Sequence, residues 1–341
     1  IKSTYYQDLT KMNTFRMKVK AKCFIEYDSV ADLVDIEFEE LARPILHIGG
    51  GSNLLFTEDF KGTVLHSKIN FIEVLDECPG SEVLVSVGAG VVFDDFCEWA
   101  ANEGLWGVEN LSYIPGEVGA SAVQNIGAYG VEVCDHIKRV NCVSLTDGKE
   151  ISFAREECDY AYRHSIFKTP EYRGAYAVVS VEFSLNKTFT PQLAYGGIVK
   201  SLQGEGIDIN NVSAKQLRDV IIAIRNDKLP DPKVQGNAGS FFMNPIVRKE
   251  LFEEIRQKYI DVPHYTIDEQ HVKIPAAWLI EQCGWKGRSH GKAGVHHKQP
   301  LVLVNMGGAR GEDIKALAEE IQRDVNARFG IRINAEVNYI Y

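Results

Sequence analysis

The spacing of hydrophobic and polar residues predicts short strands separated by tight turns along much of the chain. Residues 83–87 alternate in the manner of a strand, and residues 178–185 form a further strand candidate. The sequence Thr146-Asp-Gly-Lys149 indicates a turn between two strands. Apolar residues 44–48 and 54–56 flank three consecutive glycines, which predicts a strand, a tight loop and a second strand.

Four other segments have the apolar spacing of helices and a stop signal at the end. They are 93–103 before Gly104, the segment from Ser213 to Pro230, 276–283 before Gly284, and 312–329 before Gly330. The second of these begins with a capping box formed by Ser213 and Gln216.

The end of the chain returns to strand-like alternation. Residues 331, 333, 335 and 337 are apolar, which predicts a strand over 331–337 with Glu336 on its polar face. A polar stretch over 204–212 has the composition of a linker. Together the patterns predict an α+β protein with mixed sheets.

Composition narrows the class of protein. A chain of 341 residues is too long for one small core, so we expect two or three domains. Its hydrophobic fraction of 45% and charged fraction of 25% are those of an ordinary globular protein. The formal charge of -10 argues against broad binding to nucleic acid or anionic membranes, and the apolar runs are too short for a membrane span.

The seven cysteines form no C-x-x-C pair, and no Cys/His cluster has zinc spacing. We therefore expect free thiols in a reducing cytosol. His296-His297 does not suggest a metal site, because neighbouring strand residues point to opposite sides. The polar start lacks the apolar stretch of a signal peptide, and because position 1 is Ile rather than Met we expect the chain to be processed or trimmed.

Two glycine-rich segments are candidates for binding a cofactor. Gly49-Gly-Gly-Ser-Asn53 would let backbone N–H groups approach phosphate oxygens, but it has neither a Rossmann nor a Walker A pattern, and a plain hairpin turn is an equal alternative. The segment 114–130 could lie flat against a planar ligand, with Gln124 and Asn125 as hydrogen-bonding groups, or it could be a structural glycine loop.

Three polar residues are candidates for chemistry. Arg163, between aromatic residues in the segment 162–168, could hold a carboxylate or phosphate, although a solvated surface arginine is the simpler reading. Ser240 follows Ala-Gly and precedes two phenylalanines, so it is either a well-aimed proton donor or a helix cap. Glu336 would by itself be read as a solvent-facing carboxylate.

Taken together, these motifs resemble the UDP-N-acetylenolpyruvoylglucosamine reductase (UDP-N-acetylmuramate dehydrogenase) family. The matching segments are GGGSNLLF, IPGEVGASAVQNIGAYG, YRHSIFK, KLPDPKVQGNAGSFFMNP, AAWLIEQCGWKG and the terminal AEV. Their order and spacing match the family from Asn13 to about Ile340. The chain is similar to the longer branch, whose substrate loop carries a tyrosine, here Tyr195.

The resemblance implies a vanillyl-alcohol-oxidase-type fold with non-covalent FAD. It implies two FAD-binding subdomains over 1–70 and 71–212, a substrate-binding domain over 213–330, and a C-terminal strand over 331–341. The glycine loops would then contact the cofactor. The residues implied are Gly49, Gly50, Gly51, Ser52, Asn53, Gly116, Gly119, Ala120, Ser121, Gln124, Asn125, Gly127, Ala128, Tyr129 and Gly130.

The implied activity is reduction of UDP-N-acetylglucosamine enolpyruvate to UDP-N-acetylmuramate in bacterial cell-wall precursor synthesis, in the cytoplasm, with NADPH as co-substrate and no metal. By motif match, Arg163 would neutralise charge at the substrate carboxylate, Glu336 would assist while carrying or sharing a proton, and Ser240 would donate a proton. The implied substrate contacts are Tyr162, Tyr195, Lys228, Asn244, Tyr265, Lys286 and Gln299.

Two positions depart from the family pattern. Asn338 and His164 stand where the family often has Arg and Asp, and Arg332 could replace the missing cation near Glu336. Two other functions stay open at this level: a flavin oxidase on the same scaffold that uses O2, and a non-enzymatic module that only binds a nucleotide sugar or flavin.

Overall fold

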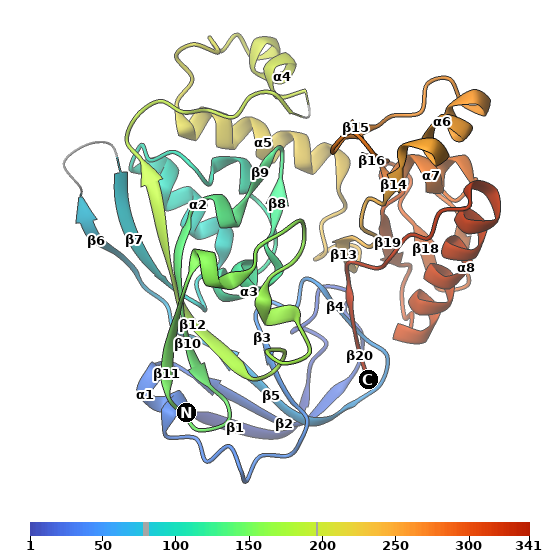
Figure 1. Cartoon of the computed structure of the whole chain (residues 1–341). Coiled ribbons are helices and arrows are strands. Elements are labelled where there is room, and N and C mark those ends of the chain that lie inside the picture. The colour runs from blue at the N-terminus through green and yellow to red at the C-terminus, as the bar shows by residue number, and fades with distance from the viewer. Residues whose placement is uncertain (78–81, 196) are drawn as a thin grey trace. The chain divides into compact units, whose positions relative to one another are not determined.

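The computed structural model describes residues 1–77, 82–195 and 197–341 (Figure 1). The chain forms two compact units, and each consists of several segments. Unit 1 comprises residues 1–7, 21–50 and 61–227, and unit 2 comprises residues 8–20, 51–60 and 228–341. The chain therefore passes from unit 1 to unit 2 inside the first glycine loop, between Gly50 and Gly51.

Unit 1 contains a four-stranded sheet in the order β1-β2-β5-β3, in which β3 and β5 run parallel. Its strands are β1 (Lys2–Asp8), β2 (Lys20–Tyr27), β3 (Ile45–Ile48) and β5 (Phe60–Ser67), and the short helix α1 (Val30–Val34) follows β2. Ser29 accepts a hydrogen bond from the Asp32 backbone N–H and caps this helix.

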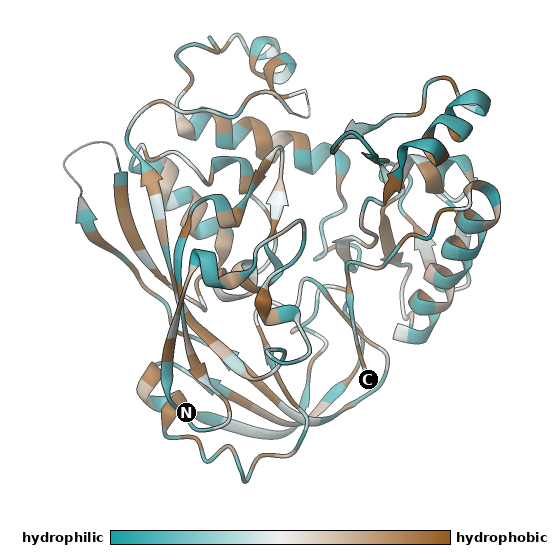
Figure 2. Ribbon diagram, in the orientation of Figure 1, coloured by the Kyte–Doolittle hydropathy of each residue, from teal (hydrophilic) through white to brown (hydrophobic). Residues whose placement is uncertain are grey.

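A five-stranded antiparallel sheet in the order β11-β10-β12-β7-β6 completes the β-structure of unit 1, apart from the short pair β8–β9. Figure 2 shows hydrophobic residues along β7 and β12, where Val85 and Val181 are fully buried. The strands are β6 (Ile72–Glu77), β7 (Glu82–Gly88), β8 (Gly127–Ala128), β9 (Val131–Glu132), β10 (Ile137–Ser144), β11 (Glu150–Ala154) and β12 (Tyr176–Asn186).

The helices of unit 1 pack apolar faces on these strands and on one another. In α2, Phe96 contacts Phe183 of β12 with ring centroids 4.7 Å apart. The α-helices are α2 (Phe93–Asn102), α3 (Val118–Gln124), α4 (Ile198–Gly204) and α5 (Ala214–Lys228), and the 3-10 helices are η1 (Glu109–Leu111), η2 (Val133–Asp135), η3 (Arg155–Cys158) and η4 (Ile166–Lys168).

Unit 2 has three small sheets, in the orders β13-β19-β18-β17, β14-β16-β15 and β20-β4. The strands are β4 (Leu54–Phe56), β13 (Asn237–Ser240), β14 (Ile246–Arg248), β15 (Tyr265–Thr266), β16 (His271–Lys273), β17 (Ser289–His290), β18 (Ala293–Val295), β19 (Val302–Asn305) and β20 (Asn338–Ile340). The helices are α6 (Lys249–Lys258), α7 (Ala276–Gln282) and α8 (Gly311–Phe329).

The predicted helices are confirmed with shifts of one or two residues at their ends. The capping box of α5 is present, since Ser213 N–H donates to Gln216 Oε1 at 2.9 Å and Gln216 N–H donates to Ser213 Oγ at 3.1 Å. Gly330 ends α8 at φ +67°, a conformation that glycine adopts without strain.

The predicted strand over 331–337 is wrong in its bounds. Only residues 338–340 form a strand, β20, which pairs in parallel with β4. Residues 331, 333 and 337 are buried as the alternation requires, but they lie in extended chain with a single bridge, Phe242 to Ala335. Alternation reports which side of an extended segment is buried, and not whether its backbone has a partner strand.

The glycine loop at residues 49–51 connects two strands, as predicted, but the hairpin alternative is wrong. β3 pairs in parallel with β5, while β4 pairs with the C-terminal β20. The two strands therefore belong to different sheets, and the glycines between them are not a tight turn of one antiparallel pair.

The predicted turn at residues 146–149 is present and connects the antiparallel strands β10 and β11.

Six cysteines carry free thiols, and Cys78 lies outside the described residues. Among the helices that the structure describes, none is both long and apolar enough to cross a bilayer. The division into segments 1–70, 71–212, 213–330 and 331–341 stays a prediction.

The apolar stripe of α8 generates a stability prediction. Replacing the fully buried Ile321 by alanine leaves a cavity and should lower the free energy of unfolding by about 2–5 kcal/mol. The exposed Glu319 on the same helix gives the matched control, Glu319→Ala, which should change it by less than about 0.5 kcal/mol. Urea denaturation measures both; equal effects would show that the stripe is not a packed core.

Candidate active site

The backbone of the first glycine loop packs closely on the start of the second in unit 1. A Cβ on Gly49 would lie 3.1 Å from Ala120 Cβ and 3.2 Å from Glu117 Oε2. A Cβ on Gly50 would lie 3.4 Å from Gly116 Cα. The two segments come this close because Gly49, Gly50 and Gly116 carry no side chains, and the side chains of Glu117 and Ala120 lie against Gly49.

The second half of the first loop belongs to unit 2. Gly51 has φ +62°, and a Cβ there would lie 2.0 Å from Met12 O, so only glycine fits. Asn53 Nδ2 donates to Glu336 O at 3.2 Å, and Asn338 N–H donates to Asn53 O at 3.0 Å. The loop therefore holds the backbone from Glu336 to Asn338.

The second glycine segment continues from α3 into a left-handed turn at Asn125, φ +46°. The Asn125 side chain is fully buried: Nδ2 donates to Ala161 O at 2.8 Å and to Glu132 Oε2 at 3.1 Å, while Oδ1 accepts from Cys134 N–H at 3.2 Å. These bonds use the amide to fix the loop itself, a role that the sequence prediction of a ligand-facing amide did not contain.

Arg163 occupies a tight turn and is held in a conformation that is costly for a residue with a side chain. Its φ is +54°, and His164 N–H donates to Ala161 O at 2.9 Å to close the turn. Lys168 Nζ donates to Arg163 O at 2.8 Å. The guanidinium lies 5.2 Å from the centre of the Tyr162 ring.

The Arg163 guanidinium also reaches the second glycine segment. Nη2 donates to Gly127 O at 2.7 Å and Nη1 donates to Asn125 O at 3.3 Å. A Cβ on Gly127 would lie 2.7 Å from Nη1, so the absence of a side chain there makes room for the cation. The structure thus brings Arg163 together with Asn125 and Gly127 of the predicted cofactor set.

Ser240 is exposed at the end of β13, next to the left-handed Gly239 at φ +67°. It pairs with Val302 of β19, and the buried Asn237 accepts a hydrogen bond from Gly239 N–H at 2.9 Å. The helix-cap alternative is wrong, because Ser240 lies in a strand and precedes the buried Phe241 and not a helix.

Glu336 lies beside the segment that carries Ser240. Its backbone N–H donates to Phe241 O at 2.8 Å, and the neighbouring Met243 N–H donates to Asn334 O at 2.9 Å. The side chain of Glu336 is half-buried. The segments that carry Ser240 and Glu336 therefore lie side by side within unit 2, whereas Arg163 belongs to unit 1.

The remaining predicted substrate contacts have mixed environments. Asn244 Oδ1 accepts from Ala276 N–H at 2.9 Å and caps α7, and Lys286 Nζ forms an ion pair with Glu281 at 2.8 Å. Gln299 is half-buried, with Oε1 accepting from Leu301 N–H at 3.3 Å. Tyr265 is exposed in β15, and Lys228 is the exposed last residue of α5.

Tyr195 is exposed and lies against the second glycine segment. Its ring meets Tyr129 edge-on at 6.5 Å, and a Cβ on Gly130 would lie 3.6 Å from Tyr195 Cβ. Asn110 Nδ2 donates to Tyr129 O and to Gln192 O at 3.0 and 2.9 Å, so one buried amide holds both segments. Asn110 has no motif around it that the sequence analysis could have used.

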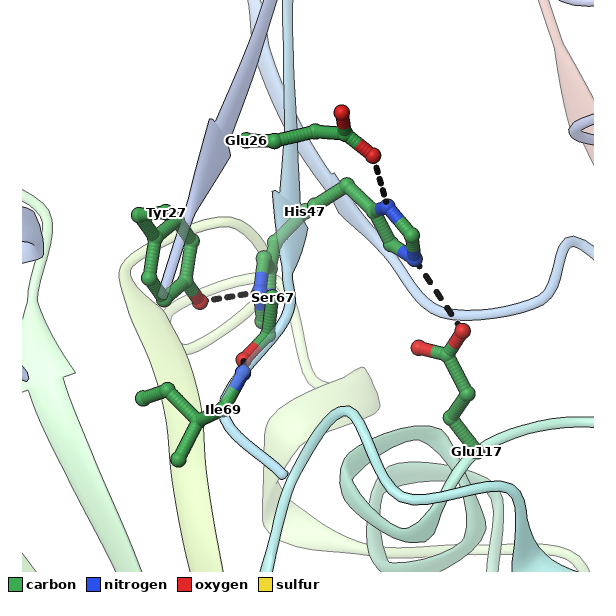
Figure 3. A network of polar contacts seen from close by, with 7 residues as sticks. Glu26, Tyr27, His47, Ser67, Ile69 and Glu117 are labelled. Carbon is green, nitrogen blue, oxygen red and sulfur yellow. Dashed lines mark hydrogen bonds and ion pairs between the residues drawn. The ribbon is translucent and has the colours of Figure 1, made fainter. Parts of the chain in front are cut away.

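A second group that the sequence analysis missed joins Glu26 and Glu117 through a histidine (Figure 3). His66 of β5 is buried between two carboxylates: Nδ1 is 3.1 Å from Glu26 Oε1 and Nε2 is 3.0 Å from Glu117 Oε1. Nearby, Tyr27 and His47 share a 2.7 Å hydrogen bond, and burial lowers the pKa of His47 to about 4. Glu117 stands within the quoted IPGEVG motif, but nothing local to Glu26 or His66 indicates the contact.

The two positions that depart from the family pattern, His164 and Asn338, contact other residues in the structure. His164 Nε2 lies 3.4 Å from Asp159 Oδ2, and Asn338 binds Asn53 through its backbone and, at 3.4 Å, through its side chain. Arg332 is exposed. Across the described residues, no three His, Cys, Asp or Glu side chains are arranged to hold a metal ion.

The glycine segments fit a flavin dinucleotide, because their packing leaves backbone where side chains would block a pyrophosphate or ring. A family model for an FAD binding domain matches residues 21–154, the part of the chain that holds both segments. A model for the C-terminal domain of UDP-N-acetylenolpyruvoylglucosamine reductase matches residues 231–340.

Two solved structures share the fold. The reductase from Thermus caldophilus aligns with a TM-score of 0.67 at 20% identity, covering 100% of this chain and 98% of that one. The 6-hydroxy-D-nicotine oxidase from Arthrobacter nicotinovorans aligns with a TM-score of 0.52 at 17% identity, covering 97% and 86%. The fold is thus α+β of the vanillyl-alcohol-oxidase type. With the FAD-binding match and the reductases to which the chain is 53% and 46% identical, the protein is an FAD-dependent oxidoreductase.

Curated relatives identify the family. The UDP-N-acetylenolpyruvoylglucosamine reductase of Bacteroides fragilis (strain YCH46) is 53% identical over 333 residues, 97% of this chain and 98% of that protein. The enzyme of that name from Porphyromonas gingivalis (strain ATCC 33277) is 46% identical over 335 residues, 97% of each. The chain belongs to the UDP-N-acetylenolpyruvoylglucosamine reductase family, which confirms the resemblance seen in its motifs.

The contact between Gly127 and Arg163 generates a prediction. Gly127→Ala should push the flexible guanidinium away from Gly127 O, so kcat should fall by about tenfold or more. The added Cβ would also lie 3.0 Å from Val131 O, so the melting temperature should fall slightly. Gly204, at the end of α4, has open space around its Cβ position, so Gly204→Ala is the matched control. Steady-state kinetics and thermal unfolding measure both variants; unchanged kcat in Gly127→Ala would contradict the need for this placement.

Proposed function

We propose that Arg163, Ser240 and Glu336 perform the chemical step of the family reaction, the NADPH-dependent reduction of UDP-N-acetylglucosamine enolpyruvate to UDP-N-acetylmuramate. The observation that carries the proposal is the hydrogen bond from Glu336 N–H to Phe241 O at 2.8 Å, which keeps the glutamate beside the segment of Ser240. The chemistry that FAD supplies when bound is transfer of a hydride from NADPH to the vinyl carbon of the substrate.

The glycine residues would hold the cofactor by their backbones. Gly49 and Gly50 and the segment 116–130 contribute from unit 1, and Gly51, Ser52 and Asn53 from unit 2. The side chain of Asn125 would contribute indirectly, because its hydrogen bonds fix the loop in which residues 127–130 follow.

Arg163 would bind the substrate carboxylate, toward which electrons move when the vinyl carbon receives its hydride. A guanidinium binds a carboxylate through two parallel N–H donors and stays charged throughout. Its turn, its stacking on Tyr162 and its bond to Gly127 O fix its direction before substrate arrives. Such a preset charge stabilises a developing anion without further rearrangement.

Ser240 would give a proton to the carbon next to the carboxylate, which completes the reduction. Its hydroxyl is exposed at a strand end whose backbone is fixed by Asn237 and by Phe241 N–H, which donates to Leu301 O at 2.7 Å. Glu336, carrying or sharing a proton, would bind the same carboxylate as Arg163 without opposing its charge. Lys228 would assist Ser240 by favouring the form that has lost its proton.

The residues that would bind the substrate are those matched to the family motifs: Tyr162, Tyr195, Lys228, Asn244, Tyr265, Lys286 and Gln299. Lys286 suits a diphosphate as a point charge. We place the reaction in the cytoplasm, since free thiols at all six described cysteines are usual in a reducing compartment.

Ser240→Ala tests the proposal most sharply. Loss of the proton donor should slow product formation from the enolpyruvyl substrate by about 10²-fold or more, while reduction of bound FAD by NADPH stays within about twofold of the original, because that half-reaction needs no proton from Ser240. Anaerobic stopped-flow absorbance measures each half-reaction separately.

The control is Ser289→Ala, which removes another exposed strand hydroxyl of unit 2 and should leave both half-reactions unchanged. Equal slowing of both half-reactions in Ser240→Ala would contradict the role given to Ser240. Rapid flavin reoxidation by O2 without substrate would instead favour an oxidase.

A further inference from the structure

The side chains of His66, Glu26 and Glu117 can all be hydrogen-bonded only when they hold two protons between them. Both imidazole nitrogens lie within hydrogen-bond distance of a carboxylate oxygen, at 3.1 and 3.0 Å. A carboxylate only accepts, so the three groups must share two protons, on imidazolium or on neutral imidazole plus one carboxyl group. Removal of one proton leaves a nitrogen lone pair facing a carboxylate, and that contact becomes repulsive.

Glu117 is the member of this group that contacts the glycine segments directly. Glu117 follows Gly116, against which Gly50 packs, and its own Cβ and Oε2 lie 3.3 and 3.2 Å from the Cβ position of Gly49. Its backbone is fixed as well, since Ser121 N–H donates to Glu117 O at 2.9 Å. The Glu117 side chain therefore fills the space beneath the junction of the two segments.

His66 and Glu26 connect Glu117 to the four-stranded sheet of unit 1. Glu26 is in β2 and His66 is in β5, adjacent strands of that sheet. The side chains of His66 and Glu117 are only 5% and 13% exposed, so water replaces a lost contact poorly. The contact is thus the side-chain link between the strands and the glycine junction.

We propose that His66 is a positioning residue for the flavin cradle: the doubly bonded, two-proton state of Glu26–His66–Glu117 holds Glu117 beneath Gly49, and its loss lowers the affinity for FAD. The inference rests on FAD as the cofactor and is independent of the roles given to Arg163, Ser240 and Glu336. His66 does not touch reacting atoms in this account, and acts through Glu117.

The direction of the pH effect follows from the groups around His66. These are Glu26 and Glu117, the charge of Lys68, the neighbouring His47 and the ring of Phe24. Burial alone would lower the pKa of His66, but hydrogen bonds and charge from Glu117, with the bond to Glu26, outweigh it and raise the pKa.

A raised pKa in the folded protein means that the contact is fully present below the ordinary histidine pKa and is lost as pH rises through the raised value. The binding-competent fraction then falls, and the apparent Kd for FAD rises with it. We therefore expect FAD affinity to weaken on the alkaline side of the usual histidine titration.

The test measures the Kd of FAD from quenching of flavin fluorescence, across pH, in the full chain after removal of FAD. His66→Gln, which keeps one donor and one acceptor but cannot titrate, should raise the Kd by about tenfold at neutral pH and abolish the alkaline weakening. Glu26→Gln should flatten the alkaline weakening while leaving Gly49 and Glu117 in place.

The matched control is His290→Gln, since His290 forms a comparable pair with Glu320 at 2.8 Å in unit 2 and is exposed. It should keep the wild-type Kd and pH profile. Should His66→Gln fail to fold, imidazole NMR titration of the wild-type chain decides: a His66 pKa at or below its ordinary value overturns the proposal. A folded His66→Gln with wild-type Kd and pH profile overturns it equally.

Discussion

The close approach of the two glycine segments is the constraint on which the rest of the structure depends. A Cβ on Gly49 would lie 3.1 to 3.3 Å from atoms of Ala120 and Glu117, and a Cβ on Gly50 would lie 3.4 Å from Gly116 Cα. A residue larger than glycine at position 49 would have to displace these neighbours by a few tenths of an ångström, whereas position 50 makes an ordinary contact. A buried imidazole lies between two carboxylates, and one of them, Glu117, contacts this junction.

The same loop connects residues that we propose to bind FAD with residues that we propose to act on the substrate. The chain leaves unit 1 at Gly50 and enters unit 2 at Gly51, and two residues later Asn53 is bonded to the backbone at Glu336 and Asn338. On the other side, Gly127 O accepts from Arg163. Each glycine segment is thus one hydrogen bond from a residue that we propose to act on the substrate.

Local sequence was sufficient for features whose cause is local. The stop residues and the Ser213–Gln216 box define helices by neighbouring hydrogen bonds, and they appear as predicted. Strand 331–337 was misplaced because burial alternates there without a partner strand, and the roles of Asn125, Asn110 and His66 arise from residues distant in sequence. The family motifs named Ser240 and Glu336, but only the fold brings their segments together.

The most direct measurement of the central claim is the visible absorption spectrum of the purified protein under anaerobic conditions. A glycine framework that holds FAD for reduction of an alkene predicts flavin bands that bleach on addition of NADPH and return on addition of the enolpyruvyl sugar nucleotide. A protein that stays colourless after incubation with FAD, or whose bleached flavin is not reoxidised by that substrate, would contradict the account.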